Sequence, residues 1–229
     1  DGLAALWRKA GANNPLFNQP GGLKGTLMLG RDALGLSAGV ATLAGRSHGV
    51  EIRLGFGEEK RLDLVGNFDA LGAEGSRMLA ALLPGFNSDP VFAVSFPQGS
   101  FSLSGKAMEV FGIAGEQLVA EGQWGDGRID FSRLSAGDWG GVGFDARLVA
   151  SGTLAAPVLS GSGRVRAGAA NAPALLALYD RRGVTAGWRA ALAPSLPAEV
   201  LVDLSFPDDS GAQLASVAGK LGVGELNFR

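Results

Sequence analysis

The most regular pattern in this chain is the alternation of apolar residues with polar or small ones. In residues 51–56, Ile52, Leu54 and Phe56 occupy every second position, and the positions between and before them hold Glu51, Arg53 and Gly55. Successive side chains of a strand point to opposite faces, so this period of two predicts a strand with one apolar and one polar face. Such strands are typical of an antiparallel sheet that is wet on one side.

Runs with the same alternation recur along most of the chain. Four of them predict consecutive strands in meander order, with a hairpin loop at residues 57–60: residues 23–29, 34–43, 50–56 and 61–68. Later runs predict strands at residues 91–96, 101–106, 110–114, 117–124, 128–134, 142–150, 158–165, 199–206 and 213–228, the last with a bend near Gly219.

Helical spacing replaces the alternation in two or three short segments. Leu71, Met78 and Leu82 recur at helical rather than strand spacing, which predicts a helix near residues 71–84. A second helix is expected at residues 171–179, which begin with Asn171 as a cap and Pro173 in the first turn. A third is expected near residues 186–193.

An internal repeat relates two parts of the chain. Residues 80–97 and 190–207 agree at 7 of 18 positions without a gap, and both copies end in Ser-Phe-Pro. Self-similarity of about 110 residues favours a sheet that is lengthened by repeated units. A chance match in a chain rich in Ala and Leu is the alternative interpretation.

These patterns divide the chain into an entry segment and two β units. The entry segment covers residues 1–22, the first β unit residues 23–97 and the second residues 98–229. We expect one continuous sheet, belonging to a fragment of a longer protein. The predicted fold class is mainly β: a curved antiparallel sheet or open barrel-like groove with two or three short helices.

Composition supports a globular β protein. Of 229 residues, 46% are hydrophobic and 37 are glycine, without the three-residue period of collagen, so the glycines are expected in turns and bulges. The net charge is -2 and no block of one sign occurs, which argues against nucleic-acid binding. Because the chain has no cysteine, it has no disulfide and no thiolate ligand.

Candidate chemistry is sparse. His48 is the single histidine and falls in a predicted turn at residues 46–49, where we expect it to be solvated. No Ser-His-Asp arrangement or metal-ligand spacing is recognisable, and acidic residues such as Asp130 and Asp145 have no evident carboxylate partner. We therefore expect no catalytic residue, no metal and no cofactor. An enzyme whose site leaves no sequence pattern remains an alternative.

Tryptophans offer a second functional interpretation. Trp124 and Trp139 lie beside predicted turns, and flat indole faces suit sugar rings. They would make the chain a carbohydrate-binding or adhesin-like β-domain without catalysis. The alternative is that both side chains cover strand ends or fill a bend in the sheet.

Glycine-punctuated strands with Ala/Leu-rich helices between them resemble the AsmA-like, TamB-related family of bacterial envelope proteins. The helical stretches are residues 78–84 and 174–178. The closest likeness is a Leu-Pro followed by an alternating strand at residues 196–204, then residues 212–221 and a closing strand at residues 224–228.

The resemblance implies a protein anchored in the inner membrane by an N-terminal helix, with its body in the periplasm. It further implies an apolar groove that binds phospholipid or another acyl lipid, for lipid transport between membranes or outer-membrane assembly, with possible envelope protein partners. This chain departs from the family pattern because no run of about 18 apolar residues supplies the anchor.

Alternation selects the residues that would face such a groove. The candidate groove residues are Ile52, Leu54, Phe56, Phe92, Val94, Phe96, Ile129, Phe131, Val200, Val202, Leu204 and Phe206.

Overall fold

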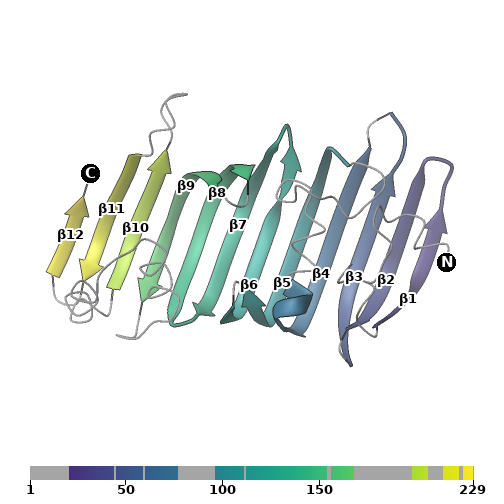
Figure 1. The fold of residues 1–229 in the computed structure, drawn as a ribbon, viewed down its shortest axis with the longest axis horizontal. Helices are drawn as coiled ribbons and strands as arrows, with labels where there is room; N and C mark the ends of the chain where they lie inside the picture. Colours follow the sequence, from purple (N-terminus) through teal and green to yellow (C-terminus); the bar gives the residue numbers. More distant parts are fainter. Residues whose placement is uncertain are drawn as a thin grey trace.

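The computed structural model describes residues 21–43, 45–58, 60–76, 96–110, 112–153, 156–167, 198–205, 214–221 and 224–228. These residues form one sheet of 12 strands in sequence order, with β1 and β12 at opposite edges (Figure 1). The strands are β1 (Gly21–Leu29), β2 (Ala33–Leu43), β3 (Arg46–Gly55), β4 (Arg61–Leu71), β5 (Gln98–Val110), β6 (Ile113–Gly125), β7 (Arg128–Trp139), β8 (Val142–Thr153), β9 (Ala156–Ala167), β10 (Ala198–Ser205), β11 (Leu214–Leu221) and β12 (Gly224–Phe228). The predicted mainly β class is confirmed as a single open, mostly antiparallel sheet.

The first four strands form the predicted meander. β1 pairs with β2, β2 with β3 and β3 with β4, all antiparallel. Two boundaries differ from the prediction. β1 begins at Gly21, inside the predicted entry segment, and β3 begins at Arg46, because the alternation of Ile52 and Leu54 extends back through Val50 to His48.

One neighbouring pair breaks the antiparallel order. β4 and β5 are parallel, with Leu64 opposite Phe101. Two parallel neighbours cannot be joined by a tight hairpin turn and need a longer crossover connection. Of that connection, residues 73–76 form one short helix. The helix predicted near residues 71–84 is wrong at its start, since Leu71 is the last residue of β4; residues 77–84 are not among those described.

Strands β5 to β9 form successive hairpins, and two predictions fail along the chain from β5 onward. The strand predicted at residues 110–114 is instead the tip of a hairpin: Val110 ends β5, Ile113 begins β6, and Gly112 between them has φ 77°, a left-handed conformation that glycine adopts at low cost. The predicted bent strand at residues 213–228 is two strands, since β11 and β12 pair with each other antiparallel.

Several predicted features fall outside the described residues. They are residues 1–20 of the entry segment, residues 91–95 of a predicted strand, and the helices at residues 171–179 and 186–193. The internal repeat also stays a prediction: β10 belongs to its second copy, whereas the corresponding residues 88–95 of the first copy are not described. The two predicted β units share the one sheet, and β4 and β5 pair across their boundary.

Candidate apolar binding face

The sheet has one apolar and one polar face. On the apolar face, side chains from β3 to β7 pack into a cluster whose largest buried members include Phe68, Phe101 and Trp124. The cluster consists of Leu54, Leu62, Leu64, Phe68, Leu71, Phe96, Phe101, Leu103, Trp124 and Ile129, and their exposure is 8% or less. The alternate residues of β4 and β5, such as Asp63 and Ser102, lie on the polar face.

Six of the predicted groove residues belong to this face. Leu54, Phe96 and Ile129 are buried in the cluster. The other three, Ile52, Phe56 and Phe131, are half-buried against it. The sequence predicts Phe96 as the last residue of a strand, whereas the structure places it in the segment just before β5.

Three further predicted residues lie in β10. Val200, Val202 and Leu204 occupy register positions opposite Val165, Gly163 and Gly161 of β9. These positions continue the rows that carry the apolar side chains of β8, since Leu148 pairs with Gly161 and Phe144 with Val165. The last three predicted residues, Phe92, Val94 and Phe206, are not described.

Sequence reasoning missed most of the cluster. Leu62, Leu64 and Phe68 carry the same period of two as the predicted residues of β3, so the signal was present in β4. Phe101 and Leu103 repeat it in β5. Only the pairing of β4 with β5 places these two sets side by side, and that pairing leaves no mark in either strand.

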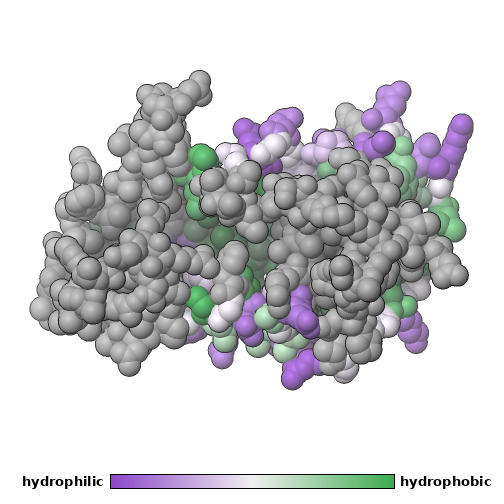
Figure 2. All heavy atoms as spheres, viewed as in Figure 1, coloured by the Kyte–Doolittle hydropathy of each residue, from purple (hydrophilic) through white to green (hydrophobic). Residues whose placement is uncertain are grey.

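On the apolar face, the side chains toward β7–β9 are less deeply buried than those of β4 and β5. Phe131, Phe144, Leu148 and Leu159 are half-buried there, in contrast to the buried residues of β4 and β5. Hydrophobic residues are visible over this central part of the sheet in Figure 2. A smaller cluster lies beside them, formed by Val142 and Ala167 with Ile113, Trp139 and Val165 packed against it.

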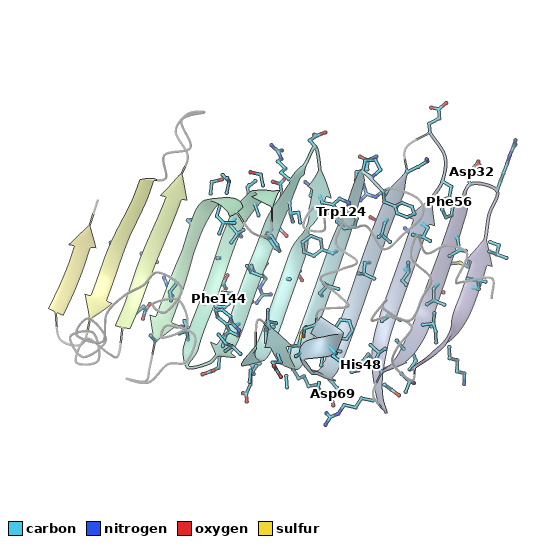
Figure 3. All side chains as sticks on the ribbon, in the orientation of Figure 1. Asp32, His48, Phe56, Asp69, Trp124 and Phe144 are labelled. Atoms are coloured by element: carbon cyan, nitrogen blue, oxygen red, sulfur yellow. The ribbon has the colours of Figure 1, made fainter. Side chains whose placement is uncertain are left out.

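Both candidate sugar-stacking tryptophans make contacts at strand ends. Trp124 is 4% exposed, and its Nε1–H donates to the carbonyl oxygen of Phe96 at 3.2 Å. Its ring stacks on Phe101, with 6.2 Å between centroids, so no free indole face remains for a sugar. Trp139 is half-buried, and its Nε1–H donates to the carbonyl oxygen of Val110 at 3.3 Å. Figure 3 shows Trp124 on the central strands, toward one end of them.

His48 is not the solvated turn residue that the sequence predicts. It lies in β3, is 2% exposed, and packs on the ring of Phe68 with 5.4 Å between centroids. Its Nδ1 accepts a hydrogen bond from the backbone N–H of Asp69 at 3.4 Å, while Nε2 has no hydrogen-bond partner among the described residues. Burial lowers the pKa of His48, and the nearby Asp69 carboxylate opposes that shift. Figure 3 shows His48 and Asp69 near the same end of their strands.

The polar face carries hydrogen bonds and ion pairs between neighbouring strands. Asp63 Oδ1 accepts from the Arg61 Nε at 2.8 Å and from the Ser100 hydroxyl at 2.6 Å. Lys106 Nζ lies 3.0 Å from Asp69 Oδ1, and this hydrogen bond lowers the pKa of Asp69. The contacts of Asp63 with Ser100 and of Asp69 with Lys106 join β5 to β4.

A shallow hollow crosses the polar face from β5 to β9. It has a volume of about 670 Å³, and its walls are two rows of side chains that include Ser100 and Asp130 in one row and Ser102 and Arg147 in the other. A trough of this kind lies between any two rows of side chains on a pleated sheet, so we assign no ligand to it.

Within the described ranges, no group of three or more histidine, aspartate or glutamate residues could hold a metal ion. No helix in this part of the chain is long and apolar enough to cross a membrane. Comparison with protein-family models, with curated proteins and with solved structures finds no match to this chain.

Proposed function

We propose that the chain is a periplasmic segment of an AsmA-like envelope protein and binds the acyl chains of phospholipid on the apolar face of its sheet. Its role would be non-catalytic, in lipid transport between membranes or in outer-membrane assembly. In the full-length protein, an N-terminal helix would anchor this segment to the inner membrane. Other envelope proteins would be its partners.

The observation that supports this proposal is the continuity of the apolar face. Apolar side chains follow one face from Leu34 of β2 to Val165 of β9. With neighbouring strands about 4.8 Å apart, the eight strands from β2 to β9 span about 34 Å. This span is longer than an acyl chain of a phospholipid.

The half-buried part of this face is the proposed point of contact. Each methylene group that moves from water onto apolar side chains contributes about 0.8 kcal/mol. Phe131, Phe144 and Leu148 are only half-buried, so they have apolar surface left to cover. The polar face keeps its serines and ion pairs in water, as expected for a sheet that offers lipid one side only.

Adjacent residues of β8 provide a matched test of this proposal. Leu148 pairs with Phe131 on the apolar face, whereas Val149 pairs with Asp130 on the polar face, and both side chains are half-buried. The purified chain is mixed with vesicles of phosphatidylethanolamine and phosphatidylglycerol whose acyl chains carry bromine. Brominated chains that reach the protein quench its tryptophan fluorescence, and native mass spectrometry counts the lipids that stay bound.

We expect quenching and bound phospholipid for the unchanged chain and for Val149→Gln, and a loss of both for Leu148→Gln. Circular dichroism and thermal unfolding identify variants that have lost the fold. The proposal is wrong if the folded, unchanged chain binds no lipid, or if the two substitutions reduce binding equally.

A further inference from the structure

The first strand of the sheet carries an unusual concentration of exposed apolar side chains. Every residue of β1 is exposed, and Leu23, Leu27, Met28 and Leu29 are 53%, 57%, 50% and 74% exposed. These four are half of the large exposed apolar residues in the described part of the chain.

β1 is also an open strand edge. Among the described strands it pairs with β2 alone, so its other side presents unpaired backbone N–H and C=O groups. Natural sheets usually protect such edges with charges, prolines or a covering segment. β1 has no proline and a single charged residue, Lys24, so its sequence supplies little of this protection.

The exposed leucines continue the apolar face of the sheet. Leu27 pairs with Leu36, which pairs with Ile52, and Leu29 pairs with Leu34, which pairs with Leu54. The period of two places Leu23 on the same face. The apolar face therefore reaches the edge of the sheet, where its leucines are exposed.

We infer that β1 pairs antiparallel with β1 of a second copy of this chain, around a two-fold axis that passes through Gly25. A second copy fits this edge because the strand is complementary to itself in one register. In that register all nine residues find a partner: Leu23 lies opposite Leu27 of the copy, Leu29 opposite Gly21, and Gly25 opposite Gly25.

Charge and side-chain contacts favour the same register. Lys24 lies opposite Thr26 of the copy, so the two lysines do not face each other. Directly opposed residues of an antiparallel pair point to the same face, so Leu23 and Leu27 meet on the apolar face. The dimer joins two sheets into one whose apolar faces lie on the same side.

This inference does not rest on lipid binding, and its test uses no lipid. A nine-residue strand edge is smaller than a standard protein interface, so the dimer should dissociate on dilution. Light scattering coupled to size exclusion, over a dilution series of the full chain, should show a reversible monomer–dimer equilibrium. A monomer at every concentration overturns the inference, and so does open-ended growth, which indicates pairing of β1 with β12.

A charge at the centre of the proposed contact should abolish the dimer. Leu27→Lys places an ammonium group opposite Leu23 of the copy, where it would lose water without gaining a partner. The matched control is Val65→Lys, which adds the same charge to the polar face of β4, where the side chain is 45% exposed. We expect a monomer for the first variant and an unchanged dimer for the second; equal dimerisation of both variants overturns the assignment.

Cysteine cross-linking tests the register, because the unchanged chain has no cysteine. A mixture of Leu23→Cys and Leu27→Cys chains should form a disulfide-linked dimer on mild oxidation, since opposed Cβ atoms lie about 4.5–5.5 Å apart. Leu27→Cys alone should link poorly, because its two copies are displaced by four residues, about 13 Å. Equal cross-linking in both experiments contradicts the register.

Discussion

At the scale of single residues, His48 is the described ionisable side chain whose surroundings differ most from water. It is 2% exposed and contacts Phe68, and the groups that act on its charge are Asp69 and Arg46. Burial disfavours the imidazolium form and so lowers the pKa of His48 below the 6.5 of the free side chain. The hydrogen bond to Nδ1 favours the neutral tautomer with its proton on Nε2.

This burial predicts a pH-dependent stability. As the pH falls below about 6.5, histidine in the unfolded chain takes up a proton before His48 does in the folded chain, so the free energy of unfolding decreases. The decrease ends once the pH is below the folded-state pKa. Urea unfolding between about pH 7 and pH 5 measures the slope, and His48→Phe should flatten it, because phenylalanine does not titrate. An equal slope in both proteins would contradict the assignment to His48.

The packing around Gly99 leaves no space for a side chain at this position. A Cβ atom at this position would collide with the carbonyl oxygen of Leu62 and the indole ring of Trp124. Gly99→Ala should therefore reduce the free energy of unfolding by about 1–3 kcal/mol, the usual cost of overpacking a core.

The control for this prediction is Gly72→Ala, since a Cβ atom at Gly72 would meet no heavy atom within 4 Å. Urea unfolding of both variants provides the comparison. If the two alanines shift the midpoint equally, the close packing of Trp124 over Gly99 is wrong.

At the scale of elements, the junction of β4 and β5 differs most from the other strand pairs of the sheet. It is the parallel pair, and Asp63 binds across it: Oδ1 accepts from the backbone N–H of Ser100 at 3.1 Å and from its hydroxyl at 2.6 Å. Arg61 holds the same carboxylate from its own strand. The carboxylate thus connects the beginning of β5 to β4.

Removing this carboxylate should weaken the junction. Asp63→Ala leaves the N–H and hydroxyl of Ser100 without their acceptor, and hydrogen bonds to charged groups contribute about 1.5–3 kcal/mol. We expect a loss at the lower end of that range, because the Asp63 side chain is 26% exposed and water can replace part of the contact. Hydrogen exchange at the Ser100 amide should accelerate.

Asn67→Ala is the control on the same pair of strands. Asn67 Oδ1 accepts only one hydrogen bond across the junction, from the Ser104 hydroxyl at 3.3 Å in an exposed position, and it is uncharged. Its loss should change stability by much less. An Asn67→Ala variant as unstable as Asp63→Ala would show that the carboxylate has no special role.

At the scale of the whole molecule, the sheet is built almost entirely of contacts between strands that are neighbours in sequence. Its strand order follows the chain from β1 to β12, and its main cluster lies over β3 to β7. Each strand is therefore stabilised by its two neighbours and by the side chains on the apolar face. The two edge strands, β1 and β12, have one neighbouring strand each among those described and lie outside the main side-chain cluster.

This arrangement predicts graded hydrogen exchange. The amides of β4 to β6 should exchange most slowly, because they have two neighbours and lie beneath buried side chains, and those of β1 should exchange early. Mass spectrometry of proteolytic fragments measures the gradient. The experiment uses Leu27→Lys, so that pairing of β1 with a second copy does not protect that strand. Uniform protection across all strands would contradict a sheet in which each strand is stabilised by its neighbouring strands and by the side chains packed on it.

The sequence by itself determined where most of the described strands lie and which face their alternating apolar residues take. Both follow from local properties, since the period of two in residues such as Ile52 and Leu54 is a property of the strand itself. The extended start of β3 and the turn at Gly112 were missed because glycines weaken the alternation there, and the boundary between β11 and β12 left too weak a signal to divide the run.

Only the tertiary structure decided which strands become neighbours and what each side chain meets. The parallel pairing of β4 with β5 brings Leu64 beside Phe101 and Asp63 beside Ser100. Phe68 from the next strand buries His48, and the carbonyl oxygen of Phe96 accepts a hydrogen bond from Trp124. These outcomes depend on contacts between residues distant in sequence, and no local pattern encodes the partner.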